Sequence, residues 1–402
     1  MAKGFFKESI ITSKREPSNI PKCGACGLHK GCLSPKMGPT GEGKKKILII
    51  AEAPGEEEDR QGTQLIGKCG ELLREHLRSL KINLDKDCRK TNAIICHPPK
   101  NETPSPEKIE ACRPNILKEI KSFQPDIILL LGACAVSSVI GCEWTDDIKP
   151  LNKWVGWHIP SRKFNAWLCP TYHPAYLDRE EDPILEKIFH AHLEAALQLK
   201  GKPYEEIPDE EKEIEILSEE DAVSRMEGYK KAGGTIAFDY ETTGLKPDSD
   251  KQEIVSCSIC HNGKETIAFL MTDATTEALI PILKTGRIKK IASNMKFEER
   301  WTMAKMGMKV KGWWWDTMLS AHILDNRKRI TSIKFQSYIR FGVVDYNQHV
   351  KSYFEAPSAN ELNRIRELDE DDLLLYNGLD SLLEYRVAVQ QMREMGYPFK
   401  GE

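Results

Sequence analysis

The sequence predicts two α/β domains joined by a short acidic linker. Its 402 residues exceed the roughly 100–200 residues of a single domain. In the first half, apolar strand-like runs alternate with helical stretches. In the second half, closely spaced strands come first and helices follow. Apolar residues make up 40% and charged residues 30% of the chain, which is typical of a folded globular protein and excludes wholesale disorder.

The first half has the pattern of a parallel sheet. Strands are expected at 46–51, 126–132 and 165–170, and helical segments follow the first two. Such alternation predicts a three-layer α/β/α domain with helices on both faces of the sheet. Ligands of these sheets bind outside the carboxyl ends of the strands. Glu52 and His173 follow two of the expected strands and are therefore candidate site residues.

The composition changes near residue 200. Residues 1–200 carry 30 basic and 26 acidic side chains, whereas the remainder carries 28 and 35. The acidic stretch 201–211 contains two prolines and no apolar period, so we interpret it as a linker between domains at 1–200 and 212–402. Four short strands, at 213–217, 235–244, 254–260 and 265–271, predict that the second domain builds a sheet and then packs helices on it.

Composition also limits the partners. A formal net charge of −3 excludes a simple polycationic nucleic-acid binder, although a local basic groove stays open. No run reaches the roughly 18 apolar residues of a membrane span, and the first ten residues lack the apolar core of a signal peptide. We therefore expect a cytoplasmic protein with no membrane partner and with reduced thiols.

Cysteines are concentrated in the first half, which holds ten of the 12. Cys23 and Cys26 form a CxxC pair, and Cys96 and Cys112 form a C-x15-C pair. Four thiolates in two pairs are able to hold zinc or an iron–sulfur cluster. A zinc ribbon normally has a second CxxC. The only other such pair, Cys257 and Cys260, lies on an expected strand, where a spacing of three places the two side chains on opposite faces and makes a poor metal pair. Scattered core cysteines are the alternative, and they suit Cys134 and Cys169 better than Cys23.

The first half resembles the family 4 uracil-DNA glycosylases. The matching segments are AEAPGEEED (51–59), GTQLIGKCGELL (62–73), TNAIICHPPKNETPSPEKIEAC (91–112), PDIILLLGACA (125–135) and HPAYL (173–177). The resemblance implies a glycosylase-like fold and a structural [4Fe–4S] cluster. It assigns Cys23, Cys26, Cys96 and Cys112 as the ligands, with Cys32 as the nearest rival.

The same resemblance implies a base-binding pocket. It assigns uracil reading to Asn92, stabilisation of the leaving base to His173, and the acidic motif beside the sugar to Glu52 and Glu58. The family's first glycine is Ala51 here, and its Pro-Phe pair is Gln64 and Leu65. Leucine cannot stack on a base as a phenyl ring does, which removes about 1–3 kcal/mol. A non-catalytic DNA-binding or docking module is therefore the alternative.

Carboxylates form the chemical signal of the second half. Asp239 and Glu241 are two apart on an expected strand, so both side chains point to one face. Asn294 and Glu298 are four apart on an expected helix, and Tyr376 and Asp380 have the same spacing. Clustered carboxylates repel one another unless a cation lies between them. Two Mg²⁺ or Mn²⁺ ions suit such a site, as in two-metal phosphodiester hydrolysis.

These motifs resemble the DEDD superfamily of 3′–5′ exonucleases over 212–395, in the subtype with tyrosine in the third motif. The resemblance implies a ribonuclease H-like (DnaQ-like) fold. It implies that Asp239 bridges both metals, Glu241 and Asp380 hold the first, and Tyr376 orients the attacking water. The second motif usually ends in Asp, so Glu298 predicts slower cleavage. Asn294 is a candidate substrate contact, and Asp316 is expected to cap a helix.

Together the two halves resemble the N-terminal half of certain bacteriophage family A DNA polymerases. We therefore expect a proofreading-type exonuclease acting on 3′ ends of DNA, single-stranded or in frayed duplex. A DNA polymerase subunit or domain is the expected partner. An RNA exonuclease of the ribonuclease D type has the same motifs and is the alternative.

Overall fold

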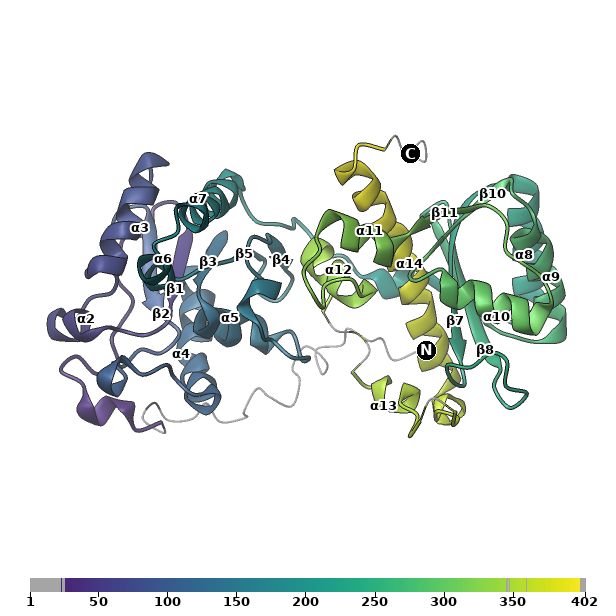
Figure 1. Cartoon of the computed structure of the whole chain (residues 1–402), viewed down its shortest axis with the longest axis horizontal. Coiled ribbons are helices and arrows are strands. Elements are labelled where there is room, and N and C mark those ends of the chain that lie inside the picture. Colours follow the sequence, from purple (N-terminus) through teal and green to yellow (C-terminus); the bar gives the residue numbers. More distant parts are fainter. Residues whose placement is uncertain (1–22, 24–25, 345, 347, 359, 398–402) are drawn as a thin grey trace. The chain divides into compact units, whose positions relative to one another are not determined.

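The computed structural model describes residues 23, 26–344, 346, 348–358 and 360–397. The N-terminal segment that we interpret as lacking a signal peptide lies outside them. The chain divides into two compact units (Figure 1). The N-terminal unit runs to Ile207 and includes Tyr338–Val344, and the C-terminal unit comprises Pro208–Ser337 and the residues after Val344. This division falls inside the predicted linker.

The N-terminal unit contains a five-stranded sheet in the order β2-β1-β3-β5-β4. The strands are parallel except β4, which pairs antiparallel with β5 at the edge. Its strands are β1 (Ile47–Ala51), β2 (Cys88–Asn92), β3 (Ile127–Leu131), β4 (Ile159–Ser161) and β5 (Ala166–Thr171). Its helices are α2 (Glu56–Gln61), α3 (Lys68–Ser79), α4 (Pro106–Phe123), α5 (Ala133–Val139), α6 (Pro174–Glu180) and α7 (Pro183–Gln198).

Every residue of β1 and β3 is buried, so both faces of this sheet are covered, as the apolar runs predict. On one face, α3, α6 and α7 pack on the sheet through Leu73, Leu77, Leu177, Phe189 and Leu193. Strand β2 is not predicted, because its sequence CRKTN contains no run of apolar residues. It pairs in parallel with β1 at the opposite edge from β4.

The C-terminal unit contains a six-stranded sheet in the order β11-β10-β7-β8-β9-β6. Strands β7, β8 and β9 form an antiparallel meander, and β10 and β6 join it in parallel with β7 and β9. Its strands are β6 (Ile214–Ile216), β7 (Gly234–Thr242), β8 (Ile254–His261), β9 (Glu265–Leu270), β10 (Ile288–Ala292) and β11 (Trp313–Asp316). Its helices are α8 (Glu219–Ala232), α9 (Asp273–Lys284), α10 (Lys296–Met306), α11 (Thr317–Leu324), α13 (Lys351–Phe354) and α14 (Glu370–Glu394), and α12 (Ile333–Phe341) begins in this unit.

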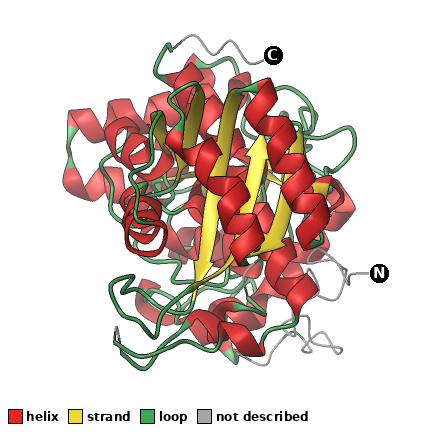
Figure 2. Cartoon of the chain, turned by 90° about the vertical axis from the view of Figure 1, so that its right-hand side faces the viewer, coloured by secondary structure: helices red, strands yellow, loops and turns green. Residues whose placement is uncertain are grey.

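Helices cover both faces of this sheet, and Figure 2 shows helices lying in front of its strands. Helices α8, α9 and α10 bury one face through side chains that include Met226, Leu283 and Trp301. The other face packs on α14. Cys257 and Cys260 belong to these two opposite cores. The prediction that their spacing makes a poor metal pair is therefore confirmed.

In the part of the chain that the structure describes, no helix combines the length and the apolar character needed to cross a membrane.

Candidate functional site

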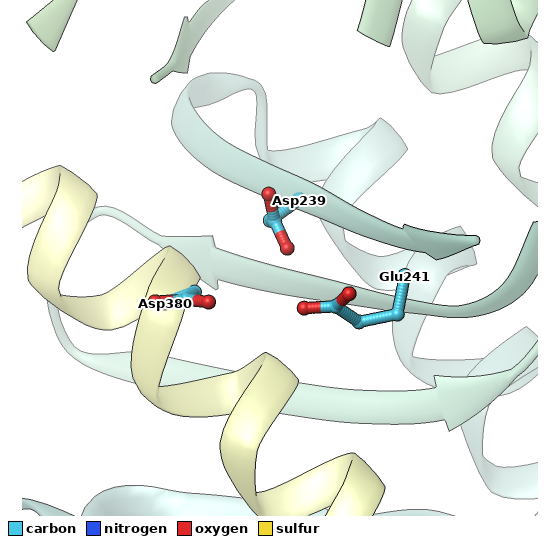
Figure 3. A group of neighbouring side chains, drawn as sticks. All are labelled: Asp239, Glu241 and Asp380. Carbon is cyan, nitrogen blue, oxygen red and sulfur yellow. The ribbon is translucent and has the colours of Figure 1, made fainter. Parts of the chain in front are cut away.

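Three carboxylates meet beside the central strand of the C-terminal sheet. Asp239 and Glu241 lie on β7, and Asp380 lies on α14, which crosses the sheet (Figure 3). One oxygen from each carboxylate lies within 4.8 Å of one from both others. The predicted alternation along β7 is confirmed, because both side chains point toward α14.

Neighbouring polar side chains fix these carboxylates. The Asn377 amide on α14 donates to Oδ2 of Asp239 at 2.8 Å, and its own carbonyl accepts from the Ser256 hydroxyl on β8 at 3.0 Å. The Lys334 ammonium, in the first turn of α12, donates to both oxygens of Asp380 at 3.1 Å. The Tyr346 hydroxyl also donates to Asp380.

Tyr376 lies one helical turn before Asp380, and its hydroxyl accepts from Lys334 at 2.6 Å. Its ring packs between Phe354 and Tyr346. Burial raises the pKa of the Tyr376 phenol well above its usual range, and the negative charge of Asp380 raises it further. The phenol therefore keeps its proton, which leaves it able to donate to an oxygen in the cavity.

Keeping the carboxylates of the triad ionised in this buried position costs free energy. Burial raises the pKa of Asp239 well above the usual carboxyl range, and the nearby Asp380 raises it further, while Lys334 lowers it. Burial and the charge of Asp239 act on Glu241 in the same direction. A divalent cation removes this repulsion.

The second exonuclease motif, Asn294 to Glu298, does not lie on one helix as predicted. Asn294 precedes α10 instead of lying on it, and it has a left-handed backbone with φ of 66°. The backbone N–H groups of Asn294 and Met295 donate to Asp316, which also caps α11 by accepting from Leu319 N–H at 3.0 Å. The predicted capping role of Asp316 is therefore confirmed. Glu298 lies in the first turn of α10 and is 1% exposed.

A cavity of about 500 Å³ opens beside the acidic group. Asp239, Glu241, Tyr376 and Asp380 line it, together with Lys334, Glu384 and other residues. Oxygen ligands from several elements suit Mg²⁺ or Mn²⁺. The acidic triad is consistent with a magnesium site.

A second cavity, of about 460 Å³, lies in the N-terminal unit. Glu52 follows β1, Asn92 ends β2 and His173 follows β5, so the carboxyl ends of three strands bring these side chains together. Leu65 and Glu58 also line it. All five residues predicted for this pocket therefore lie around one cavity.

Asn92 and His173 have groups available for a ligand. Asn92 is 1% exposed, and its Nδ2 has no hydrogen-bond partner within the described residues. His173 caps α6, and its Nδ1 accepts from Ala175 N–H at 3.1 Å. Burial and the charge of Arg179 lower the pKa of His173 to about 4. The ring is therefore neutral near pH 7, and its Nε2 carries the proton.

Leu65 and Glu58 also have structural roles beside this pocket. The Glu58 carboxylate accepts from the N–H groups of Gly55 at 2.7 Å and Leu65 at 2.5 Å, so it caps α2 and fixes the loop. Leu65 has a left-handed backbone with φ of 56°, and its side chain is only 2% exposed. A Cβ on Gly70 would lie 2.0 Å from the Leu65 carbonyl oxygen, so glycine permits this close approach.

Three of the four predicted cluster cysteines, Cys23, Cys96 and Cys112, have donors near their sulfur atoms. Lys36 N–H donates to Cys96 Sγ at 3.2 Å, and Ile95 N–H to Cys112 Sγ at 3.4 Å. The Asn115 amide lies 3.8 Å from Cys112 Sγ and 3.9 Å from Cys23 Sγ. Such donors stabilise thiolates and the sulfur ligands of metal clusters. These donors are compatible with sulfur ligands of a cluster.

Family comparisons match both units. The family model described as "Uracil DNA glycosylase superfamily" matches residues 39–197. The family model described as "3'-5' exonuclease" matches residues 213–361. The type-4 uracil-DNA glycosylase of Thermotoga maritima is 34% identical over 192 residues, which cover 48% of this chain and 95% of that protein. The chain belongs to the uracil DNA glycosylase superfamily. This glycosylase domain is followed by a DnaQ-like 3′–5′ exonuclease domain.

Further relatives cover each half or both. The type-4 uracil-DNA glycosylase of Pyrobaculum aerophilum is 36% identical and covers 40% of this chain and 82% of that protein. The DNA polymerase of Bacillus phage SP01 is 27% identical over 382 residues, which are 87% of this chain and 40% of the polymerase. Among solved structures, Escherichia coli RNase D aligns with a TM-score of 0.36 at 15% identity, over 46% of this chain and 45% of RNase D.

Several residues of the two cavities are not part of any motif in the sequence. Lys334, Tyr346 and Arg179 lie outside the motifs, and only the fold brings them to the cavities. Asn377 and Glu384 had a usable signal, because they lie on α14 beside the third motif. Glu384 follows Asp380 by four residues, which places it on the same helical face.

Proposed function

We propose that the exonuclease domain of this chain hydrolyses DNA from its 3′ end with two divalent cations, as a proofreading-type nuclease. The observation that carries the proposal is the convergence of Asp239, Glu241 and Asp380 on one cavity with Tyr376. The likeness to uracil-DNA glycosylases and to a phage DNA polymerase favours DNA as substrate. A polymerase domain or subunit is the partner that fits these relatives.

The residues around the acidic cavity have distinct roles in this proposal. Asp239, Glu241 and Asp380 would hold the cations, and Glu298 would contribute a further carboxylate. When bound, the cations supply activation of a water nucleophile and stabilisation of the attacking and leaving oxygens. Lys334 orients both Asp380 and the Tyr376 hydroxyl. Tyr376, kept protonated, donates a hydrogen bond that positions the nucleophile.

The proposal is tested on matched DNA and RNA oligonucleotides labelled at the 5′ end. With Mg²⁺ the chain should shorten the DNA stepwise from the 3′ end, and with a chelator it should leave the DNA intact. A DNA blocked by a 3′-terminal phosphorothioate is the control. Shortening that persists with the chelator contradicts the metal-dependent site, and a preference for RNA favours a ribonuclease D-type function instead.

A second activity is favoured by the unpartnered Asn92 amide and the neutral His173 ring. We propose that this cavity binds an extruded uracil, with Asn92 reading its edge and His173 donating from Nε2 to the departing base. Glu52 lies beside the sugar in this arrangement. The cysteine set Cys23, Cys26, Cys96 and Cys112 would hold a [4Fe–4S] cluster with a structural role.

Leu65→Phe should raise uracil excision by roughly 10-fold, since base stacking on an aromatic ring contributes about 1–3 kcal/mol. Excision is measured on a uracil-containing oligonucleotide with a chelator present to silence the exonuclease. The rate should not titrate near pH 6.5, because the pKa of His173 is about 4.

Asn92→Ala is the control and should abolish excision in both backgrounds. If wild type and Leu65→Phe release no uracil but still bind DNA, the glycosylase domain is a DNA-binding or docking module.

A further inference from the structure

The N-terminus of helix α3 opens onto the cavity of the N-terminal unit. Gly67, Lys68 and Cys69 line this cavity, and Gly67 is the N-cap residue of the 12-residue helix. Glycine has no side chain that could cap the helix, and the N–H groups of residues 68–70 have no backbone acceptor among the described residues. Such unpaired N–H groups, at the positive end of the helix dipole, favour an anion.

Two side chains of the same cavity also point to a ligand. The buried Asn92 amide has no partner for its Nδ2 among the described residues. Arg179 lines the cavity from α6, on the same helical face as Ala175. In the part of the chain that the structure describes, the Arg179 guanidinium makes no hydrogen bond or ion pair. A guanidinium without a partner is suited to bind an oxyanion.

Several carboxylates line this cavity too, and those of α2 are already engaged. Glu58 accepts from two backbone N–H groups, and Glu56 and Glu57 pair with Arg60 at 3.2 Å and 2.7 Å. An anionic ligand is therefore expected beside α3 and α6 instead of beside α2. Lys68 pairs with Asp178 at 2.6 Å, but its side chain is 79% exposed. Solvent weakens such a pair, so it does not compete strongly with a ligand.

We propose that the N-terminus of α3 and Arg179 together bind one backbone phosphate of DNA, next to the extruded uracil nucleotide. This inference rests on the proposed uracil-binding function and deepens it, because it assigns the phosphate side of the substrate to groups outside the base pocket. Asn92 would hold the base inside the cavity, while the exposed Arg179 would hold the phosphate at its rim. Phosphate oxygens accept from backbone N–H groups at helix N-termini and from guanidinium groups.

The test measures binding of labelled single-stranded DNA that contains one 2′-fluoro-deoxyuridine, which resists excision. A chelator silences the exonuclease. Arg179→Gln should weaken binding about 10-fold, as expected for one lost charged hydrogen-bond partner. It should also flatten the slope of log affinity against log salt by about 0.7, the contribution of one phosphate contact. Arg78→Gln, at the exposed C-terminal end of α3, is the matched control and should bind like the wild type.

Neutral methylphosphonate linkages identify the phosphate. One such linkage is placed on the 5′ or on the 3′ side of the 2′-fluoro-deoxyuridine. At one of these positions the wild type should lose affinity, whereas Arg179→Gln should lose little more than it has already lost. Equal loss in both proteins at both positions would overturn the inference, and Arg179 would then only balance the charge of Glu52.

Gly67→Asp tests the helix end. Gly67 has a φ of −79°, which any residue adopts, and an added Cβ would meet no atom within 4 Å. Aspartate is a good N-cap residue, so the melting temperature should stay the same or rise. Its carboxylate would occupy the place of the phosphate, so DNA binding should weaken about 10-fold. Gly67→Ser, which caps the helix without a charge, should bind closer to the wild type.

Wild-type DNA affinity of Gly67→Asp would overturn the role of the helix end. A separate outcome concerns the proposed glycosylase function. If the wild type binds the uracil DNA no better than a matched thymine DNA, the uracil pocket fails as a proposal. A flatter salt slope for Arg179→Gln on thymine DNA would then still support the phosphate site, and an unchanged slope would overturn it.

Discussion

Asp239→Asn should reduce 3′–5′ degradation of DNA by at least about a thousandfold, or about 4 kcal/mol of transition-state stabilisation. Asp239 would help to hold the proposed cations, and asparagine offers only a neutral oxygen in its place. The fold should survive, because the new side chain has the same shape and still accepts from the Asn377 amide. The rate is measured on a 5′-labelled oligonucleotide with saturating Mg²⁺.

The same variant separates a catalytic role from a structural one. In the metal-free protein, Asp239 is pressed against other acidic groups, which raise its pKa. Removing its charge relieves this repulsion, so Asp239→Asn should melt at the same or a higher temperature than wild type when a chelator is present. Asp371→Asn, on an exposed turn of α14, should leave rate and melting unchanged. A variant that loses activity only because it unfolds would contradict the assignment.

Cys112→Ser should remove the iron–sulfur cluster from the glycosylase domain. Cys112 is 5% exposed, and Ile95 N–H and the Asn115 amide surround its sulfur. Burial raises the pKa of its thiol to about 11, so a metal is needed to hold it as thiolate near neutral pH. Iron and sulfide analysis and the visible absorption spectrum measure the loss. The melting temperature of this domain should fall, because cluster binding stabilises the folded state.

Cys32→Ser is the discriminating control. Cys32 lies beside Cys96 and donates weakly to the backbone at Leu28 and His97. The Cys32→Ser variant should keep the full iron content. Exonuclease activity should persist in both Cys32→Ser and Cys112→Ser. Loss of the cluster in Cys32→Ser with retention in Cys112→Ser would assign the ligands the other way.

The parts of the fold that sequence predicts best are those whose pattern has one physical cause. Strands β1, β3 and β5 are buried on both faces, so their apolar runs mark them directly. Alternation along β7 places Asp239 and Glu241 on one side because a strand has a period of two. The four-residue spacing of Tyr376 and Asp380 works for the same kind of reason on α14.

Prediction fails where a polar side chain is buried by a partner that the sequence does not reveal. Strand β10 reads IKKIA, yet Lys290 is fully buried because its ammonium donates to the carbonyls of Thr285 and Ile288. Lys90 in β2 is buried against Asp85 in the same way. Asn294 takes a left-handed turn set by Asp316, which lies 22 residues away along the chain. These partners exist only after the chain has folded.

Helix α14 delivers Tyr376, Asn377, Asp380 and Glu384, and 138 residues separate Asn377 from its partner Asp239. A chain still under synthesis can pair β7, β8 and β9 before this helix has left the ribosome. The three carboxylates then do not yet form a group, and neither Lys334 nor Tyr346 has Asp380 to hold. Proteolytic removal of α14 would have the same effect on a finished chain. Whatever chemistry the acidic group performs is therefore withheld from nascent and clipped forms of the domain.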